Sequence, residues 1–282
     1  MIPCFLASDL HGHTDRYEKL IAAIERDRPA ALFLGGDLMP HGLGYAYRGD
    51  FVGDFLIENF RTLRDRMGKN YPEIFLILGN DDARSEEKAI LEAETAGLWH
   101  YCHMRRVEFG DFTVYGYAAV PPTPFRLKDW ERYDVSRFVD PGSISPEEGR
   151  FTVETSRREL KFATIADDLQ KLTGTDNLER SIGLFHAPPY QSKLDRAALD
   201  GKTVDHVPLD VHIGSIAVRR FIEERQPLLT LHGHVHESAR LTGAWSETIG
   251  RTVCLSAAHD GPELCLVRFD PEKPAEASRE LL

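Results

Sequence analysis

The stretch Leu231-His232-Gly233-His234-Val235-His236 is expected to organise the fold, because an apolar run delivers three imidazoles within five positions. In an extended backbone, side chains two residues apart point the same way, so the three histidines are expected to form one row. Gly233 allows a second group to approach the backbone closely. Such a row is typical of part of a metal site, although histidine-rich tracts also form surface clusters or hydrogen-bonded core positions.

Composition indicates one catalytic domain over residues 1–282. The chain has 282 residues, 42% of them hydrophobic, which suffices for one large core or for one domain with a long insertion. The formal net charge is −11, so the surface is expected to repel extended nucleic acid and anionic membrane. A small anion could still bind where metal ions reverse the local field.

Cysteine usage and the N-terminus predict a cytoplasmic protein. The four cysteines are dispersed and show no C-x-x-C pairing, so we interpret them as free thiols in a reducing cytosol. The apolar run at 2–7 meets Asp9 too soon for a signal sequence, and no apolar run is long enough to span a bilayer.

Five short apolar runs each end abruptly in residues that can bind metal. Such runs are typical of buried strands that break into loops, and in open α/β sheets sites assemble at the C-terminal strand edge. We therefore expect these side chains to meet. The runs are 2–7, before Asp9 and His11; 30–34, before Asp37; 74–78, before Asn80; 181–185, before His186; and 228–231, before His234 and His236.

The intervening segments predict helices and a mixed sheet. Apolar periodicity favours helices at 15–28 (capped by Thr14), 50–67, 85–96, 152–172 and 215–225, and strands at 251–257 and 263–269. Residues 106–109 and 112–117 predict an antiparallel hairpin. Residues from about 121 to 180 begin with a long irregular stretch, which we interpret as a cap over the site, with surface decoration as the alternative. The tail from about 271 is expected to be loosely packed.

The candidate ligands are oxygen or nitrogen donors, without a thiolate among them. They suit Mn²⁺, Fe, Zn²⁺, Co²⁺ or Ni²⁺ rather than a structural zinc cage. Seven ligands are too many for one ion, whereas two ions about 3.5–4 Å apart that share a carboxylate would use them. The seven are Asp9, His11, Asp37, Asn80, His186, His234 and His236.

In this order, the motifs resemble those of the calcineurin-like metallophosphoesterase family. The motifs are Asp9-x-His11, Gly36-Asp37, Gly79-Asn80, His186 and Gly233-His234-Val235-His236. The resemblance implies a four-layer α/β/β/α fold of two mixed sheets between helices. It also implies that Asp37 bridges two metals, one held by Asp9, His11 and His236 and the other by Asn80, His186 and His234.

The resemblance further implies hydrolysis of a small phosphomonoester, phosphodiester or pyrophosphate by in-line attack of a metal-bridging hydroxide. Manganese is the expected metal. Only a carboxylate has two oxygens to serve two cations, and the neutral amide of Asn80 avoids a further negative charge where phosphate must enter. His232 lies outside the family motif, and a core position is favoured for it over a role supporting the ligands.

Asp81 departs from the family pattern, which usually has a histidine directly after the motif asparagine. An ionised Asp81 cannot donate a proton to the leaving group, although the family branch that cleaves UDP-diacylglucosamine also lacks that histidine. We hypothesise that His13 replaces it as proton donor, with an exposed loop histidine as the alternative. Asp82 is expected to cap the following helix, with orienting the proton donor as the alternative. Arg84 is expected to be a solvated charge, with a phosphate contact as the alternative.

Two other functions are compatible with the fold that the resemblance implies. Some members of the fold, such as a retromer subunit, are protein-binding scaffolds that have lost their metal ligands, whereas this chain keeps all seven donors. A nuclease would need a basic track, which the charge of −11 argues against. The substrate, the native metal and the oligomeric state do not follow from the sequence.

Overall fold

Two six-stranded sheets form the framework of the computed structural model, which describes residues 1–40 and 49–282. In the first sheet, β1 to β4 are parallel and the C-terminal strands are antiparallel. Its order is β14 (Ser278–Leu281), β13 (Cys265–Phe269), β1 (Cys4–Ala7), β2 (Ala31–Gly35), β3 (Glu73–Ile77) and β4 (His100–Tyr101).

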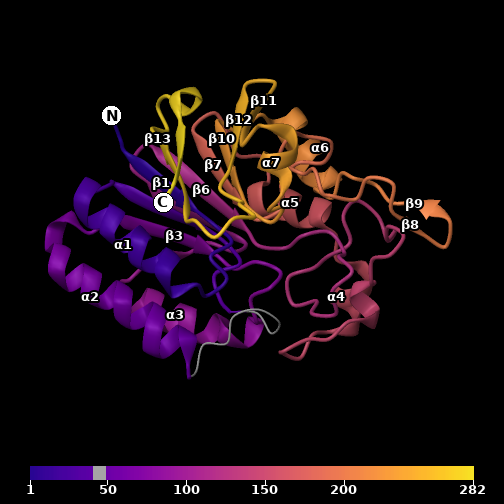
Figure 1. Ribbon diagram of the computed structural model, residues 1–282, viewed down its shortest axis with the longest axis horizontal. Coiled ribbons are helices and arrows are strands. Elements are labelled where there is room, and N and C mark those ends of the chain that lie inside the picture. The colour runs from indigo at the N-terminus through magenta and orange to yellow at the C-terminus, as the bar shows by residue number, and fades with distance from the viewer. Residues whose placement is uncertain (41–48) are drawn as a thin grey trace.

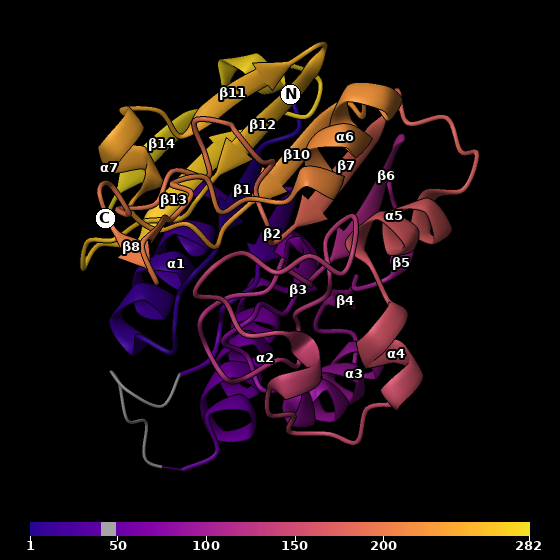
Figure 2. The ribbon, with the colours of Figure 1, turned by 90° about the vertical axis from the view of Figure 1, so that its right-hand side faces the viewer.

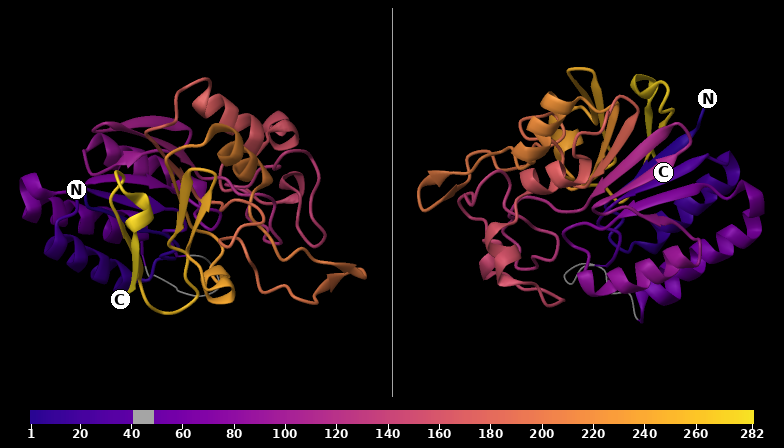
Figure 3. Two further views of the ribbon diagram at one scale, coloured as in Figure 1. Left: turned by 90° about the horizontal axis from the view of Figure 1, so that it is seen from above. Right: turned by 180° about the vertical axis from the view of Figure 1, so that it is seen from behind.

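The second sheet is also mixed, with β12, β10, β7 and β6 parallel and one antiparallel strand at each edge. Its order is β11 (Ser246–Ile249), β12 (Thr252–Ser256), β10 (Leu229–His232), β7 (Ser181–Phe185), β6 (Phe112–Tyr117) and β5 (Arg105–Phe109). A small hairpin of β8 (Thr203–Val204) and β9 (Val207–Pro208) projects from the body (Figure 3).

Helices cover the outer face of each sheet, which gives the expected four layers (Figures 1 and 2). On the first sheet lie α1 (Thr14–Asp27), α2 (Glu58–Met67) and α3 (Glu87–Thr95). On the second lie α5 (Ile165–Thr173) and α6 (Ile216–Arg225), while α4 (Arg157–Phe162) and α7 (Ser238–Thr242) are short peripheral helices. No helix in residues 1–40 and 49–282 is both long and apolar enough to cross a bilayer.

Aromatic side chains join the two sheets in the central layer. Phe33 of β2 and Phe75 of β3 stack with ring centroids 5.1 Å apart, and Phe109 of β5 meets Phe75 edge-on at 5.4 Å. All three are buried, and such pairs contribute about 0.5–1.5 kcal/mol each beyond the area they bury. The four cysteines are buried free thiols, as expected.

The structure corrects three local predictions. The helix expected over 152–172 is two helices, α4 and α5, because the Thr164 side chain accepts the Asp167 N–H at 3.1 Å and starts a new helix. The first helix begins at Thr14 with His13 as its cap, one residue earlier than expected. The tail from 271 is not loose, since β14 pairs with β13 along four residues.

The irregular stretch after β6 is internally braced. Its only regular element among the described residues before α4 is a short helical turn at Pro146–Glu148. Lys128 and Glu131 form a fully buried ion pair within it. Asp129, also buried, accepts hydrogen bonds from the backbone N–H groups of Arg84 at 2.8 Å and Thr152 at 2.9 Å. These bonds anchor the stretch beside the chain that follows β3, and its role as a cap stays a prediction.

Candidate metal centre

The loops that follow β1 and β2 run side by side at the C-terminal edge of the first sheet. The N–H of Asp9 donates to the Gly36 carbonyl at 2.9 Å, and that of His11 donates to the Asp37 carbonyl at 2.9 Å. This backbone pairing brings the Asp9-x-His11 motif next to Asp37.

The loops that follow β7 and β10 pair in the same way at the edge of the second sheet. The N–H of Gly233 donates to the His186 carbonyl at 3.1 Å. The two edges then meet, because the His234 N–H donates to Asp9 Oδ1 at 2.9 Å. Four of the five predicted strand ends therefore converge on one place, and the loop after β3 joins them because the Asp81 N–H donates to Asp37 Oδ1 at 2.8 Å.

The structure brings the seven predicted ligands together in two groups that share Asp37. The ligand atoms within each group lie within 4.8 Å of one another. Asn80 adjoins the second group, with its Oδ1 atom 3.2 Å from His186 Nε2. Carboxylates and imidazoles at this density fit divalent ions with oxygen and nitrogen preference. The first group is Asp9, His11, Asp37 and His236, and the second is Asp37, His186 and His234.

Four of these residues adopt a left-handed backbone conformation that non-glycine residues rarely take. The φ angles are 56° for Asp9, 48° for His11, 52° for Asp37 and 75° for His234. Each such residue costs about 1–3 kcal/mol unless its surroundings impose the conformation. Because this strain falls on predicted ligands, we infer that these backbone conformations serve to direct the ligand side chains and are kept at a cost in stability.

Glycines keep space free around the carboxylates. A Cβ atom at Gly79 would lie 2.3 Å from Asp37 Oδ1, and one at Gly233 would lie 2.6 Å from Asp9 Oδ2. Both distances are far below van der Waals contact, so a larger residue at either position would displace a carboxylate. The close approach expected at Gly233 is confirmed.

Paired histidines compensate the buried carboxylates. Burial alone would raise the pKa of the Asp9 carboxyl, but the hydrogen bond and charge of His236 outweigh it and lower the pKa to about 2. The same pairing raises the pKa of His236 to about 9, although burial opposes it. The buried carboxylates therefore favour bound positive charge. When metal is absent, protonated histidine supplies that charge.

Asp37 and His186 form a second pair of this kind. His186 Nε2 lies 3.3 Å from Asp37 Oδ2, and both side chains are buried. Burial opposes ionisation of each, but the charge of Asp37 dominates and raises the pKa of His186 to about 10. His186 Nδ1 lies 2.7 Å from the Gly35 carbonyl, to which it donates, so Nε2 faces the centre as a metal ligand would. His234 differs, because burial lowers its pKa to about 3 and keeps it neutral.

Asp81 orients Asn80. The Asn80 amide nitrogen donates to Asp81 Oδ1 at 3.1 Å, which turns the amide oxygen toward His186. The Asp81 N–H itself donates to Asp37 Oδ1 at 2.8 Å. The residue that departs from the family pattern thus braces two predicted ligands, and its carboxylate stays at the rim with 24% of its side chain exposed.

Asp82 does not cap a helix, contrary to expectation. Its fully buried carboxylate accepts three backbone N–H groups, from Leu38 at 3.1 Å, Met39 at 2.7 Å and Gly79 at 2.8 Å. Burial, reinforced by the charge of Asp37, raises the pKa of Asp82 to about 8. Asp82 therefore ties the loop that carries Asp37 to the loop that carries Asn80.

The predicted single row of three histidines is wrong. The strand ends at His232, and the left-handed backbone at His234 breaks the alternation. His232 is fully buried, with Nδ1 2.9 Å from the Ala187 carbonyl and Nε2 2.8 Å from Thr230 Oγ1. It is a core histidine, the alternative favoured from the sequence.

His13 lies at the start of α1, half-buried, and its carbonyl accepts the Arg16 N–H at 3.0 Å. Its role as proton donor stays a prediction. His212 and His259 are not part of the centre and have local partners. His212 Nδ1 lies 2.8 Å from Asp195 Oδ1, and His259 Nε2 lies 3.0 Å from Glu263 Oε2.

Two residues that hold Asp9 have no recognisable signal in the sequence. The Ser8 hydroxyl donates to Asp9 Oδ2. The buried Arg16 guanidinium donates to the Asp9 carbonyl at 2.8 Å and to the Gly261 carbonyl at 2.7 Å. Arg16 lies in the first turn of α1, and nothing in the sequence around it distinguishes this buried arginine from an exposed one.

Comparison with known proteins agrees with this geometry. A family model described as calcineurin-like phosphoesterase matches residues 2–238. The search of curated proteins found no match.

Solved structures share the fold at low sequence identity. One crystal structure has a TM-score of 0.62 at 17% identity, covering 99% of this chain and 98% of the other. The crystal structure of TT1561 of Thermus thermophilus has a TM-score of 0.55 at 16% identity, with 99% and 98% coverage. Both similarities show the arrangement of sheets and helices.

Proposed function

The chain belongs to the calcineurin-like phosphoesterase family, and from that premise we propose that it hydrolyses a small phosphate ester with two divalent metal ions. The observation that carries this proposal is that two clusters of carboxylate and histidine side chains share Asp37. When bound, two such ions would activate water and stabilise negative charge on the phosphoryl oxygens.

We assign the ligands by their grouping. Asp9, His11 and His236 would hold one ion, and Asn80, His186 and His234 the other, with Asp37 shared by both. The contact between Asn80 Oδ1 and His186 Nε2 supports placing that amide with the second ion. Manganese is our proposed metal, since it accepts both carboxylate and imidazole ligands.

The assay that tests the proposal compares metal-stripped protein with and without added Mn²⁺ on phosphomonoester, phosphodiester and pyrophosphate substrates. We expect hydrolysis of at least one class, dependent on the metal and restored when it is added back. Absence of hydrolysis across all three classes, or hydrolysis that a chelator leaves unchanged, would contradict it.

Metal binding is expected to release protons. In the metal-free protein the pKa values of His186 and His236 are raised to about 10 and about 9, so both carry a proton at pH 7. A metal ion needs the nitrogen lone pair, so binding displaces up to one proton from each, and apparent affinity rises as pH increases toward about 10. Titration calorimetry at pH 7 in buffers of different ionisation enthalpy measures this release. Heats that are independent of the buffer would rule it out.

We propose His13 as the proton donor to the leaving group, since Asp81 is occupied in orienting Asn80. His13→Gln is expected to lower turnover about 10²-fold or more for alkyl phosphates and little for nitrophenyl phosphates, whose leaving groups need no proton. Steady-state rates on the two substrates provide the measurement, with His100→Gln, at a partly exposed position of β4, as control. Equal losses on both substrates would remove His13 from this role.

The scaffold alternative is not supported, because a protein-binding role does not require these carboxylates and histidines to converge, four of them at strained backbone positions. We also propose a cytoplasmic location, with which the four buried free cysteines are compatible.

A further inference from the structure

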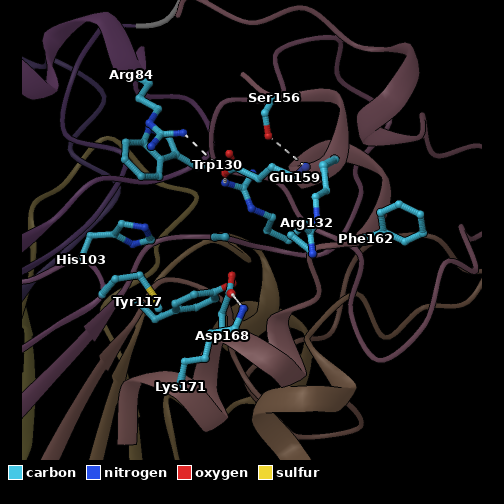
Figure 4. A pocket seen from close by; sticks show the side chains of 14 residues that line it. Arg84, His103, Tyr117, Trp130, Arg132, Ser156, Glu159, Phe162, Asp168 and Lys171 are labelled. Atoms are coloured by element: carbon cyan, nitrogen blue, oxygen red, sulfur yellow. Dashed lines mark hydrogen bonds and ion pairs between the residues drawn. The ribbon is translucent and has the colours of Figure 1, made fainter. Parts of the chain in front are cut away.

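A cavity of about 640 Å³ lies outside the metal centre, and none of the seven predicted ligands lines it (Figure 4). Its walls come from the ends of β4 and β6, the braced stretch after β6, and helices α4 and α5. Cavities of about 300–1,000 Å³ are typical of small-molecule sites.

The cavity stands at the same sheet edge as the metal centre. The Cys102 N–H, next to His103 of the cavity wall, donates to the Leu76 carbonyl of β3 at 2.8 Å. On the second sheet, the His186 N–H donates to the carbonyl of Tyr117, another wall residue, at 3.1 Å. The two walls therefore follow β4 and β6. Each of these strands neighbours a strand, β3 or β7, that leads to a predicted ligand.

The lining is positively charged, in contrast to the whole chain with its net charge of −11. Four cationic side chains face two acidic ones, Glu159 and Asp168. Glu159 already pairs with two of the cations, and Asp168 pairs with a third at 3.3 Å. Arg158 makes no ion pair with any residue of the described chain. The four cations are Arg84, Arg132, Arg158 and Lys171.

Trp130 forms a rigid part of the cavity wall. Its side chain lines the cavity and is 1% exposed, and its indole Nε1 has no partner within residues 1–40 and 49–282. The Arg84 guanidinium stacks over the ring at 5.3 Å, and His103 packs edge-on at 4.9 Å, so the indole is held in place.

His103 supplies a neutral hydrogen-bond donor to the cavity. Its Nδ1 accepts the Ala118 N–H at 3.0 Å, which places the ring proton on Nε2. Burial, aided by the charges of Arg132 and Arg84, lowers the pKa of His103 to about 3 and keeps the ring neutral. Apolar wall is contributed by Met104, Ala119 and Phe162.

We propose that this cavity is a second ligand site, which binds a small molecule that carries carboxylate or phosphate-type oxygens on an apolar body. The oxygens accept hydrogen bonds from His103 Nε2 and from the arginines, and Arg158 supplies the uncompensated positive charge. The apolar body packs on Met104 and Phe162. The site does not depend on the metal centre or on hydrolysis.

The test is titration calorimetry of metal-stripped protein with phenylphosphonate and with benzoate, which present a phosphorus oxyanion and a carboxylate on the same flat body. Phenylphosphonate has no ester bond to hydrolyse, and metal removal takes the other anion site out of the measurement. Comparing the two probes shows which oxyanion the cavity prefers. We expect at least one of them to bind in the absence of metal.

One variant probes the lining. Arg158→Gln changes an exposed side chain, so folding is preserved, and a several-fold loss is expected. The adjacent Arg157→Gln, whose side chain does not line the cavity, is the matched control and should bind as wild type does. Binding of neither probe without metal, or affinities of Arg158→Gln equal to those of Arg157→Gln, would overturn the proposal.

Discussion

Asp37→Asn is expected to lower phosphoester hydrolysis by about 10³-fold or more, the largest effect that we predict for a single substitution. Asp37 is the only residue common to both ligand groups, and its side chain is 2% exposed. An amide has one acceptor oxygen and no charge, so it cannot serve two cations. His186 would also lose the carboxylate that faces its Nε2 atom at 3.3 Å.

Rates at saturating Mn²⁺, together with the number of metal ions bound per chain, measure this effect. Asp111→Asn is the matched control, because Asp111 is an exposed aspartate in the turn between β5 and β6. Wild type and control are expected to bind two ions, and Asp37→Asn at most one tightly. A fully active Asp37→Asn protein that still binds two ions would show that Asp37 is not the shared ligand.

Asp82→Ala is expected to lower the free energy of unfolding by about 3 kcal/mol or more, because three buried N–H groups lose their acceptor. The acceptor oxygens of Asp82 hold Leu38, Met39 and Gly79, on the two loops that carry Asp37 and Asn80. Asp82→Asn keeps one oxygen and is expected to cost less. Asp82→Ala is expected both to loosen these two loops and to lower the stability of the whole domain.

Urea denaturation of metal-stripped wild type, Asp82→Ala and Asp82→Asn measures these costs without a contribution from metal binding. A second readout, metal affinity, should fall for Asp82→Ala, because the two loops are no longer tied together. If Asp82→Ala unfolds at the wild-type urea concentration and binds metal equally well, the hydrogen bonds of Asp82 do not hold the two loops in place.

The predicted ligands could be found from the sequence because each follows directly on a short apolar strand. That placement fixes which sheet edge a residue reaches, whatever the details of packing, and so Asp9, Asp37 and His186 converge as expected. His232 shows the limit of this reasoning. Its direction depends on where the strand ends and on the left-handed turn at His234, which the alternation of side chains does not reveal.

Hydrogen bonds to backbone groups could not be predicted from the sequence, because the backbone partner can lie far away along the chain. Asp82 was expected at a helix start because aspartate often caps helices, yet its partners Leu38 and Met39 lie more than forty residues away, in the loop after β2. The pairing of β14 depends on backbone groups of β13, and its exposed, charged sequence carries little strand signal.

The cavity likewise has no linear signature. Arg84 was expected to be a solvated charge, but folding stacks it on Trp130, and residues as distant as His103 and Arg158 complete the wall. Such a site becomes visible only when the helices and the braced stretch are assembled around it.

Anomalous diffraction from crystals grown with Mn²⁺ tests the two-metal centre most directly. The expected result is two peaks about 3.5–4 Å apart, with the Asp37 carboxylate between them and the other six ligands divided three and three. A single peak at saturating Mn²⁺, or two peaks without Asp37 between them, would contradict this account.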